Sequence, residues 1–500
     1  MGRRIIIKFM KVNMTNFKKE ESPILTKLQI VAAIIVSGLC WYFSNGLNGD
    51  FWYLLWLAPI PVLLISFSST AKTTFFVSFL AYLIGRLSWF GYLVSVITIV
   101  PTIILIIILS LSFALVMTMT RKAFLKNNTW LGVFIFPVFF TAFEWLLINF
   151  SPDGTATSIA YSQSDFLQLI QIASLTGILG ITFIVTFIPS VLAVGWCYRK
   201  DKTKLLPLSI FSFLILISVF LFGVFRINSD FNKNTIPAGL VVLGEETHSI
   251  NDVNFQNEIQ HIKNYAQEIT SLAQKGAKII VLPERAININ QNIDSVATNI
   301  FSDAAKQNKV FIVTGYTNLK NDKERNSSLV IDDNGNVLTD YNKVHLVKVL
   351  EDRFTPGSQI GLFDFNKTQA GTAICKDLDF PKYIKNYGEN NTALLFVPAW
   401  DFVVDDWLHS RMAILRGVEN GFSIIRTARQ GRLTISDPYG SVVAEENSSN
   451  GKATTLIGQV SLTRTNTFYT QYGEWFGYAI IAASILFIIL TILRKEKQKM

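Results

Sequence analysis

Long runs of apolar residues separated by short polar segments dominate the first 224 residues, and one further run lies near the C-terminus. A helix needs about 20 apolar residues to cross the hydrocarbon core of a bilayer, and these runs approach that length. The pattern therefore predicts a polytopic α-helical membrane bundle of about eight transmembrane helices. They are expected at about 28–45, 52–67, 74–95, 98–118, 130–150, 168–197, 205–224 and 475–493.

Between residues 225 and 473 the pattern changes to short apolar strands that alternate with helical segments. A β-hairpin is indicated at 328–341, where two apolar runs flank Asp332-Asp-Asn-Gly335-Asn336. Strands that alternate with helices, interrupted by hairpins, predict a mixed α/β sandwich. Strands are expected at about 236–243, 278–282, 310–314, 392–398 and 423–427, and helices at about 254–275, 293–308 and 409–419.

Composition and charge support and orient this arrangement. The chain is 50% hydrophobic with a mean hydropathy of +0.36, too apolar for an ordinary soluble enzyme. Lys and Arg gather at the membrane edges, whereas the connections 46–51 and 151–165 contain neither. Basic connections stay in the cytoplasm, so the N-terminus is expected inside and the α/β domain on the outer face. This topology explains the net charge of +9, and a nucleic-acid partner is not predicted.

The predicted organisation has five parts. They are a cytoplasmic N-terminal segment (1–27), a membrane domain with seven helices (28–224), a catalytic α/β domain (225–473), an eighth transmembrane helix (474–493) and a cytoplasmic tail (494–500).

One cysteine lies at the end of a predicted strand, in a turn rich in charge. Cys375 follows Thr372-Ala-Ile374 and precedes Lys376, Asp377 and Asp379. A cysteine beside a cation and free backbone N–H groups loses its proton more easily, so Cys375 is a candidate nucleophile. A small buried residue that ends a strand is the alternative. Cys40 and Cys197 fall in or beside membrane segments, so no disulfide is expected within the α/β domain.

Two further strand ends carry charged residues. Glu284 follows Ile279-Ile-Val-Leu-Pro283, and Lys343 follows the hairpin in Tyr341-Asn-Lys343. Strand ends are where α/β folds collect their sites, so these residues can converge on Cys375. A carboxylate base and an ammonium beside a thiol supply what acyl transfer needs. Taken singly, Glu284 also fits a helix-start acid and Lys343 a surface lysine.

The motifs Leu282-Pro-Glu284, Tyr341-Asn-Lys343 and Ile374-Cys375-Lys-Asp377 resemble, in order and spacing, those of the nitrilase (carbon-nitrogen hydrolase) superfamily. A domain of this kind between seven membrane helices and one resembles the apolipoprotein N-acyltransferase family. The resemblance implies a nitrilase-like αββα sandwich on the periplasmic or extracytoplasmic face of a bacterial inner membrane. It also implies a phospholipid acyl donor, a diacylated lipoprotein acceptor, a monomer, and no metal or cofactor.

The resemblance also implies a role for each matching residue. Glu284 would be the general base and Cys375 the nucleophile. Lys343 and the backbone N–H of Lys376 would stabilise the oxyanion, and Glu351 would orient Lys343. Two loops depart from the family pattern: 347–357 lacks the usual Pro-Phe-Gly-Glu, and Lys376-Asp377 replaces Tyr-Glu. Substrate choice is expected to depend on these loops.

Other residues are candidates for contact with substrate. Trp400, Phe402 and Trp407 are expected to shield the thioester from water and to touch lipid, or else to belong to the core or an interfacial aromatic belt. Glu144 and Arg86 lie within predicted membrane helices, where they line a lipid headgroup site or form a buried structural pair. The four histidines lack metal-ligand spacing, so no metal site is predicted: His248, His261, His345 and His409.

Two alternative functions remain at this stage. A membrane-anchored amidase or hydrolase would use water, or a different acceptor, on the same Glu-Lys-Cys chemistry. A non-catalytic scaffold that binds lipid on a degenerate fold is the other alternative.

Overall fold

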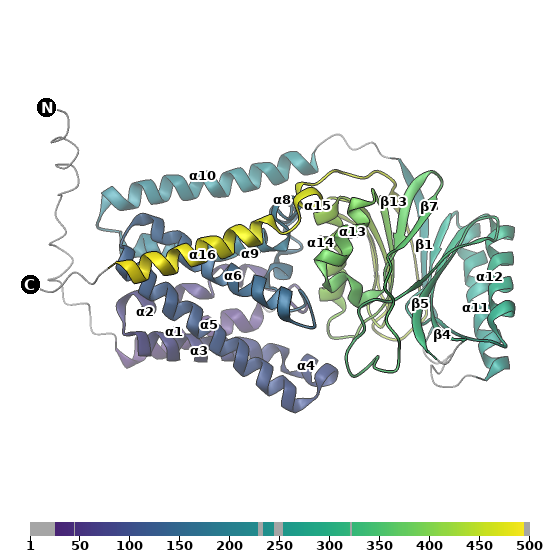
Figure 1. Ribbon diagram of the computed structural model, residues 1–500, viewed down its shortest axis with the longest axis horizontal. Coiled ribbons are helices and arrows are strands. Elements are labelled where there is room, and N and C mark those ends of the chain that lie inside the picture. The colour runs from purple at the N-terminus through teal and green to yellow at the C-terminus, as the bar shows by residue number, and fades with distance from the viewer. Residues whose placement is uncertain (1–25, 45, 229–233, 245–253, 321–322, 495–500) are drawn as a thin grey trace, which may run out of the picture.

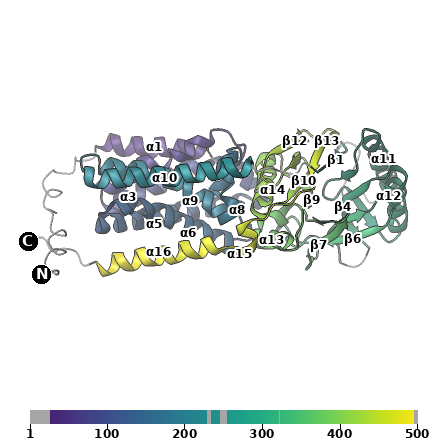
Figure 2. The same cartoon turned by 90° about the horizontal axis from the view of Figure 1, so that it is seen from above.

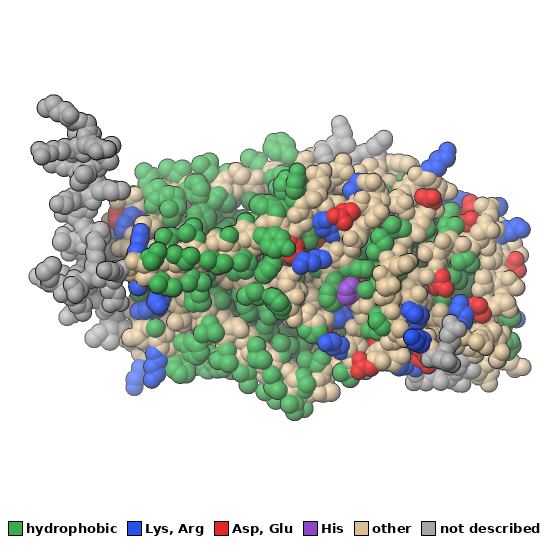
Figure 3. Space-filling model, viewed as in Figure 1, with side chains coloured by type: hydrophobic (Ala, Val, Ile, Leu, Met, Phe, Trp, Pro, Cys, Tyr) green, Lys and Arg blue, Asp and Glu red, His purple; other side chains and the backbone are tan. Residues whose placement is uncertain are grey.

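The computed structural model describes residues 26–494, except 45, 229–233, 245–253 and 321–322. The chain folds into two lobes that lie end to end, a helical lobe and an α/β lobe (Figures 1 and 2). Hydrophobic side chains cover the surface of the helical lobe, whereas charged side chains gather on the α/β lobe and at the opposite end of the helices (Figure 3). The predicted segment 1–27 and tail 494–500 fall almost entirely outside the described residues.

Six segments of the helical lobe are long and apolar enough to cross a membrane. Three further apolar segments are shorter: Lys27–Phe43, Trp52–Ser68 and Leu167–Thr176. The predicted run 168–197 divides into three helices, and its break at Gly177 has a φ of +67°. The helices are α1 (Lys27–Phe43), α2 (Pro59–Ser68), α3 (Ala71–Arg86), α4 (Phe90–Ile97), α5 (Ile99–Asn127), α6 (Ile135–Phe150), α7 (Leu167–Ile170), α8 (Ala173–Thr176), α9 (Ile178–Cys197), α10 (Lys202–Ile227) and α16 (Trp475–Leu493).

Small residues let the membrane helices approach closely. Between α1 and α3, a Cβ at Gly85 would lie 2.3 Å from Trp41 Cβ, and one at Gly38 would lie 2.8 Å from Ile84 Cβ. Helices in a bilayer gain little from hydrophobic burial against each other, so such close packing is what holds them together.

The α/β lobe has four layers. One sheet has the order β13-β1-β2-β4-β5-β6, with β3 also paired to β4, and the other has the order β12-β11-β10-β9-β8-β7. Helices α11 (Phe255–Gln274) and α12 (Asp294–Asn308) cover the first sheet (Figure 1). Helices α13 (Pro381–Glu389) and α14 (Asp406–Asn420) cover the second. This αββα order confirms the predicted mixed α/β sandwich.

Seven strands overlap the predicted runs: β1, β2, β4, β5, β6, β9 and β10. The strand predicted to reach Ile374 ends at Thr372 (β8), and β3, β7, β11, β12 and β13 have no predicted counterpart. Apolar side chains from both sheets fill the space between them, including Val281, Val313 and Phe396. The strands are β1 (Thr235–Val242), β2 (Ile279–Val281), β3 (Ile287–Asn290), β4 (Phe311–Leu319), β5 (Arg325–Ile331), β6 (Val337–Asn342), β7 (Gly361–Phe365), β8 (Thr368–Thr372), β9 (Leu394–Trp400), β10 (Ser423–Arg429), β11 (Arg432–Ser436), β12 (Val442–Asn447) and β13 (Thr454–Ser461).

Helix α14 joins the two lobes. Its apolar face, which includes Leu408, Met412 and Leu415, belongs to the same buried cluster as the interior of the membrane helices. A short helix, α15 (Phe468–Tyr472), then leads into α16. Helix α14 therefore lies between the second sheet and the helical lobe and packs against both.

Candidate active site

The three predicted catalytic residues converge although they are far apart in the sequence. Glu284 follows β2, Lys343 follows β6 and Cys375 follows β8. Lys343 Nζ lies 2.8 Å from Glu284 Oε1 and 2.9 Å from Glu351 Oε2. The Lys343 side chain is only 1% exposed. Glu351 therefore lies beside Lys343, as the resemblance implied.

Asn326 also bridges the two carboxylates, and it shares Glu284 Oε1 with Lys343. Its Nδ2 donates to Glu284 Oε1 at 2.5 Å and to Glu351 Oε1 at 2.6 Å. The backbone N–H of Val347 donates to Glu351 Oε2 at 2.7 Å. The sequence analysis did not identify Asn326. The only sequence feature that could have indicated it is the polar beginning of strand β5, Arg325-Asn326-Ser327, which precedes the apolar end of that strand.

Cys375 begins a 3₁₀ turn with φ at +42°, in the left-handed region. A non-glycine residue held there costs about 1–3 kcal/mol, and such strain concentrates at functional sites. The Sγ–H donates to the Trp400 carbonyl oxygen at 3.5 Å. The next backbone N–H, from Lys376, has no acceptor among the described residues. It is therefore available to an oxyanion formed beside the sulfur.

Asp377 connects the cysteine turn to the lysine loop. One carboxylate oxygen accepts from the Ile374 N–H at 3.0 Å and from the Tyr341 hydroxyl at 2.6 Å. The other accepts from the His345 N–H at 2.9 Å. Asp377 is fully buried, so these bonds are not exchanged with water. The sequence showed Asp377 as a departure from the family motif, but not this positioning role.

The environment of the thiol differs from the sequence expectation. Burial, together with the charge of Glu284, raises the pKa of Cys375 well above its usual value, and Lys343 opposes this only in part. The Lys376 ammonium does not face the sulfur as an activating cation, because its Nζ lies 2.7 Å from Asp153 and 3.5 Å from Asp379. The resting residue is a thiol, and its attack needs a base.

The carboxylates and the lysine differ in how their pKa values shift. Burial raises the pKa of Glu284, against the opposing charge of Lys343. Burial also acts to raise the pKa of Glu351, but Lys343 and the Val347 N–H outweigh it and lower that pKa. For Lys343, burial acts to lower the pKa, but Glu284 and Glu351 raise it well above its usual value. Lys343 therefore stays charged, and Glu284 is the more basic carboxylate.

These groups open into a cavity of about 340 Å³. Glu284, Lys343, Glu351 and Cys375 line one part of it. The other part is lined by apolar residues of the membrane helices α4 and α5, namely Leu93, Val96, Ile97 and Leu105. The cavity therefore joins a charged reaction centre to an apolar chamber within the helical lobe.

The helical lobe also holds the cysteine turn in place. Thr155, in the loop after α6, donates from its N–H and its hydroxyl to the Asp379 carbonyl oxygen, both at 2.9 Å. A Cβ at Gly154 would lie 2.3 Å from the same oxygen, so only glycine fits this close approach.

The aromatic residues and Glu144 are placed differently from one another. Trp400 and Phe402 line the cavity. Trp407 does not: it is buried in the joint between the lobes, where a Cβ at Gly49 would lie 2.4 Å from its ring. Glu144 is also outside the cavity lining, and it accepts bonds from the Ser158 hydroxyl, the Ile159 N–H and the Thr182 hydroxyl.

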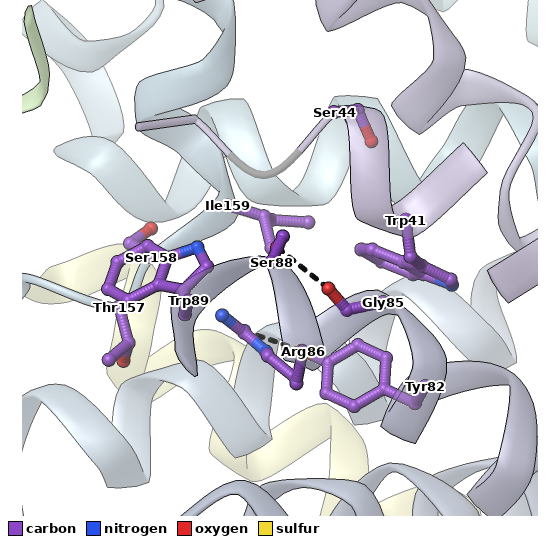
Figure 4. A pocket seen from close by; sticks show the side chains of 10 residues that line it. All are labelled: Trp41, Ser44, Tyr82, Gly85, Arg86, Ser88, Trp89, Thr157, Ser158 and Ile159. Carbon is purple, nitrogen blue, oxygen red and sulfur yellow. Dashed lines mark hydrogen bonds between the residues drawn. The ribbon is translucent and has the colours of Figure 1, made fainter. Parts of the chain in front are cut away.

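Arg86 borders a second, much smaller cavity of about 20 Å³ (Figure 4), whose lining shares Trp89 and Thr157 with that of the first. Its guanidinium lies between the rings of Tyr82 and Trp89, with centroids at 5.0 and 5.6 Å. Its Nη2 donates to the Tyr82 hydroxyl at 2.7 Å. This space holds about one water molecule, so it is no substrate site. Among the described residues, no group of three His, Cys, Asp or Glu side chains is arranged to hold a metal ion.

Comparison with known proteins agrees with both lobes. Residues 247–469 match the carbon-nitrogen hydrolase family, and residues 37–191 match the apolipoprotein N-acyltransferase N-terminal domain. The apolipoprotein N-acyltransferase of Geobacter metallireducens is 23% identical over 89% of this chain and 92% of its own length. Taken together, these matches support an apolipoprotein N-acyltransferase of the nitrilase superfamily.

Two other relatives show how the similarity is divided. The apolipoprotein N-acyltransferase of Rickettsia prowazekii is 25% identical over 76% of this chain and 79% of its own length, so it covers both lobes. The 2-oxoglutaramate amidase of Bacillus subtilis is 26% identical over 40% of this chain and 85% of its own length. The amidase match thus covers less than half of this chain, whereas the two apolipoprotein N-acyltransferase matches extend over most of it.

Proposed function

We propose that this protein moves an acyl chain from a membrane phospholipid, through a thioester on Cys375, to the α-amine of a diacylglyceryl-cysteine lipoprotein. The main support for this proposal is the lining of the 340 Å³ cavity, called the main cavity from here on. Its reactive end holds Glu284, Lys343 and Cys375, and its other end is an apolar chamber made by membrane helices. An amide hydrolase acting on soluble substrates has no need of such a chamber.

In the first half-reaction, the sulfur of Cys375 attacks the ester carbonyl carbon of the donor while Glu284 takes the thiol proton. The Lys343 ammonium and the Lys376 N–H stabilise the oxyanion that forms. Collapse of this intermediate breaks the carbon–oxygen ester bond, and Glu284 returns the proton to the departing alkoxide. The products are an acyl thioester and a lysophospholipid.

In the second half-reaction, the neutral α-amine of the acceptor attacks the thioester carbonyl. Glu284 removes a proton from the amine, the carbon–sulfur bond breaks, and the proton passes to the leaving sulfur. Cys375 returns as a thiol and the acceptor carries an amide. Trp400 and Phe402 at the cavity wall keep water from the thioester between these steps.

The protein crosses the bacterial inner membrane about eight times in this proposal, as a monomer with the catalytic domain outside. Two contacts support the orientation. Lys126 Nζ donates to the Thr491 carbonyl oxygen at 2.9 Å, so basic residues lie at the end of the bundle away from the α/β lobe. Asp153, in a connection without Lys or Arg, contacts Lys376 of the α/β lobe. Basic residues at the far end fit a cytoplasmic face there.

The test is intact-protein mass spectrometry of the full-length protein mixed with phospholipid vesicles. The wild type is expected to gain the mass of one acyl chain, and Cys375→Ala to gain none. Cys197→Ala is the matched control, because it removes a thiol of the membrane lobe and should leave the adduct intact. Addition of a diacylated lipopeptide should then discharge the acyl chain onto the peptide amine.

A membrane-anchored amidase is the second candidate, and the similarity of the α/β lobe to 2-oxoglutaramate amidase favours it. It predicts turnover of soluble amides without lipid, or an adduct that discharges only to water. Either result would replace the acyl-transfer proposal. The absence of any adduct, although Cys375 reacts with a thiol reagent, would do the same.

A further inference from the structure

One cation that lines the main cavity forms no ion pair with a carboxylate of the described residues. Four cationic side chains line this space: Arg285, Lys343, Lys376 and His409. Lys343 pairs with two glutamates, and Lys376 pairs with two aspartates. His409 Nε2 lies 2.8 Å from Asp405 Oδ2. For Arg285 there is no ion pair with any carboxylate among the described residues, and the carboxylate of its neighbour Glu284 is bound by Lys343 and Asn326.

Arg285 is nevertheless held in a defined place. Its φ of +51° lies in the left-handed region, which non-glycine residues seldom adopt. Its Nε donates to the Thr317 hydroxyl at 3.3 Å. The guanidinium lies over the rings of Phe354 and Trp400, at 5.2 and 5.3 Å from their centroids. Stacking on aromatic rings orients a guanidinium without using its N–H donors, so its terminal nitrogens stay available for a ligand.

The surroundings of Arg285 favour an anion. Burial lowers its pKa, Glu284 and Glu351 oppose this, and the nearby Arg353 and Arg429 lower it further. A bound negative charge would relieve this repulsion. The planar fork of arginine matches the two oxygens of a phosphate group, and such charge-assisted pairs are strong.

The two kinds of residue that line the cavity indicate which anion Arg285 binds. The apolar chamber lies between α4 and α5, and the reactive groups and Arg285 come from the α/β lobe. With its chain in the chamber and its ester at Cys375, a donor lipid directs its glycerol toward the α/β lobe. In a glycerophospholipid only the three-carbon glycerol separates the ester from the phosphate. The phosphate therefore falls on the side of Cys375 where Arg285 lies.

Resting on the proposed function, we propose that Arg285, supported by Trp400, binds the phosphodiester of the donor lipid and selects phospholipids over neutral glycerides. Lys376, which the sequence placed nearer to the cysteine, does not perform this role because Asp153 and Asp379 neutralise it. Arg285 is thus a specificity residue for the donor.

The experiment compares two donors with identical acyl chains, phosphatidylglycerol and diacylglycerol, each presented to the full-length protein in uncharged detergent micelles. The rate of acyl adduct formation on Cys375 is followed by intact mass spectrometry. The measured quantity is the ratio of the two rates, which does not depend on the fraction of folded enzyme. The wild type is expected to prefer phosphatidylglycerol, and Arg285→Ala to lower that preference by about tenfold to a hundredfold.

Two further variants refine the test. Arg285→Lys keeps the charge but loses the fork, so it should keep only part of the preference. Arg199→Ala is the matched control: this exposed arginine also lies over a tryptophan ring, that of Trp196 at 4.7 Å, but it does not line the cavity. It should leave the ratio within about twofold of the wild type.

Three results would overturn the inference. The first is an unchanged ratio in Arg285→Ala, with both donors slowed equally or not at all. The second is loss of the preference on addition of low concentrations of inorganic phosphate, which would mean that the site binds free phosphate and not a lipid headgroup. The third is a wild type that forms no adduct with either donor, and this alone would also refute the proposed function.

Discussion

The two ends of the main cavity are built on different principles. At the α/β end, Glu284, Lys343 and Glu351 are linked by contacts of 2.8 and 2.9 Å, and Asn326 donates to both carboxylates. At the membrane end, residues such as Leu93 and Leu105 offer only apolar surface. Proton transfer and oxyanion stabilisation depend steeply on distance, whereas an acyl chain needs only a dry space of sufficient length. Substitutions of the reactive groups at the first end should therefore remove activity, and those at the second should change the preference among acyl chains.

The largest effect is expected from Glu284→Gln. Glutamine keeps the shape of the side chain but cannot accept the thiol proton, and the resting Cys375 is a thiol because burial raises its pKa. Acyl adduct formation should slow by about 10²- to 10⁴-fold, measured by time-resolved intact mass spectrometry. A rate close to that of the wild type would show that another group is the base.

Asn326→Ala should have the next largest effect. It removes a charged hydrogen bond from each of two carboxylates, so adduct formation is expected to slow by about tenfold to a hundredfold. Because the Asn326 bond lowers the pKa of Glu284, its loss should also move the pH profile of the rate to higher pH.

That shift in the pH profile is the readout that a merely structural role would not give. The matched control is Asn334→Ala in the β5–β6 hairpin, which is expected to leave both rate and profile unchanged. A slower rate with an unmoved profile would contradict the positioning role of Asn326.

The pH dependence of the wild type follows from the same carboxylate. Glu284 must be deprotonated to act as a base, and burial raises its pKa above the ordinary value for a glutamate. The rate should fall by about tenfold per pH unit as the pH drops below that raised pKa, and it should level off above it. Glu284→Gln should abolish this limb, and a limb that persists in the variant would belong to another group.

The smallest effect is expected at the membrane end. Leu105→Trp fills part of the chamber, so it should shift the preference between long and short acyl donors by about tenfold while retaining the chemistry. Leu111→Trp on the same helix is the control, since Leu111 is exposed on the outer surface of α5 and does not line the cavity. Loss of all activity in Leu105→Trp alone would show that this end is as constrained as the other.

Much of the fold was predictable because its signals are local. The apolar runs, the alternation of strands with helices and the hairpin at 328–341 each follow from residues that are neighbours in the sequence. Even so, the run 168–197 was predicted as one span and is three helices, α7, α8 and α9. Hydrophobic periodicity alone did not reveal that break. A glycine is required at position 177 because the Tyr469 ring, almost 300 residues away in the sequence, packs closely against it.

The candidate site was predictable in its residue types but not in its contacts. Glu284, Lys343 and Cys375 carry the chemistry in their own side chains and lie at strand ends, so the sequence alone indicated them. Asn326 and Asp377 acquire their positioning roles only through partners elsewhere in the chain. No local pattern distinguishes such residues from ordinary polar residues of a strand or turn.

The charge partners of Lys376 and Arg285 show most clearly what the sequence determines and what only the tertiary structure determines. The sequence determined that Lys376 follows the cysteine and that Arg285 follows the glutamate. Only the fold brings Asp153 from the membrane lobe to Lys376, 223 positions away, and leaves no carboxylate of the described residues paired with Arg285. A buried cation is neutralised only by groups that lie within a few ångströms of it in the low-dielectric interior. The tertiary fold determines which groups those are, and the order of residues in the sequence does not.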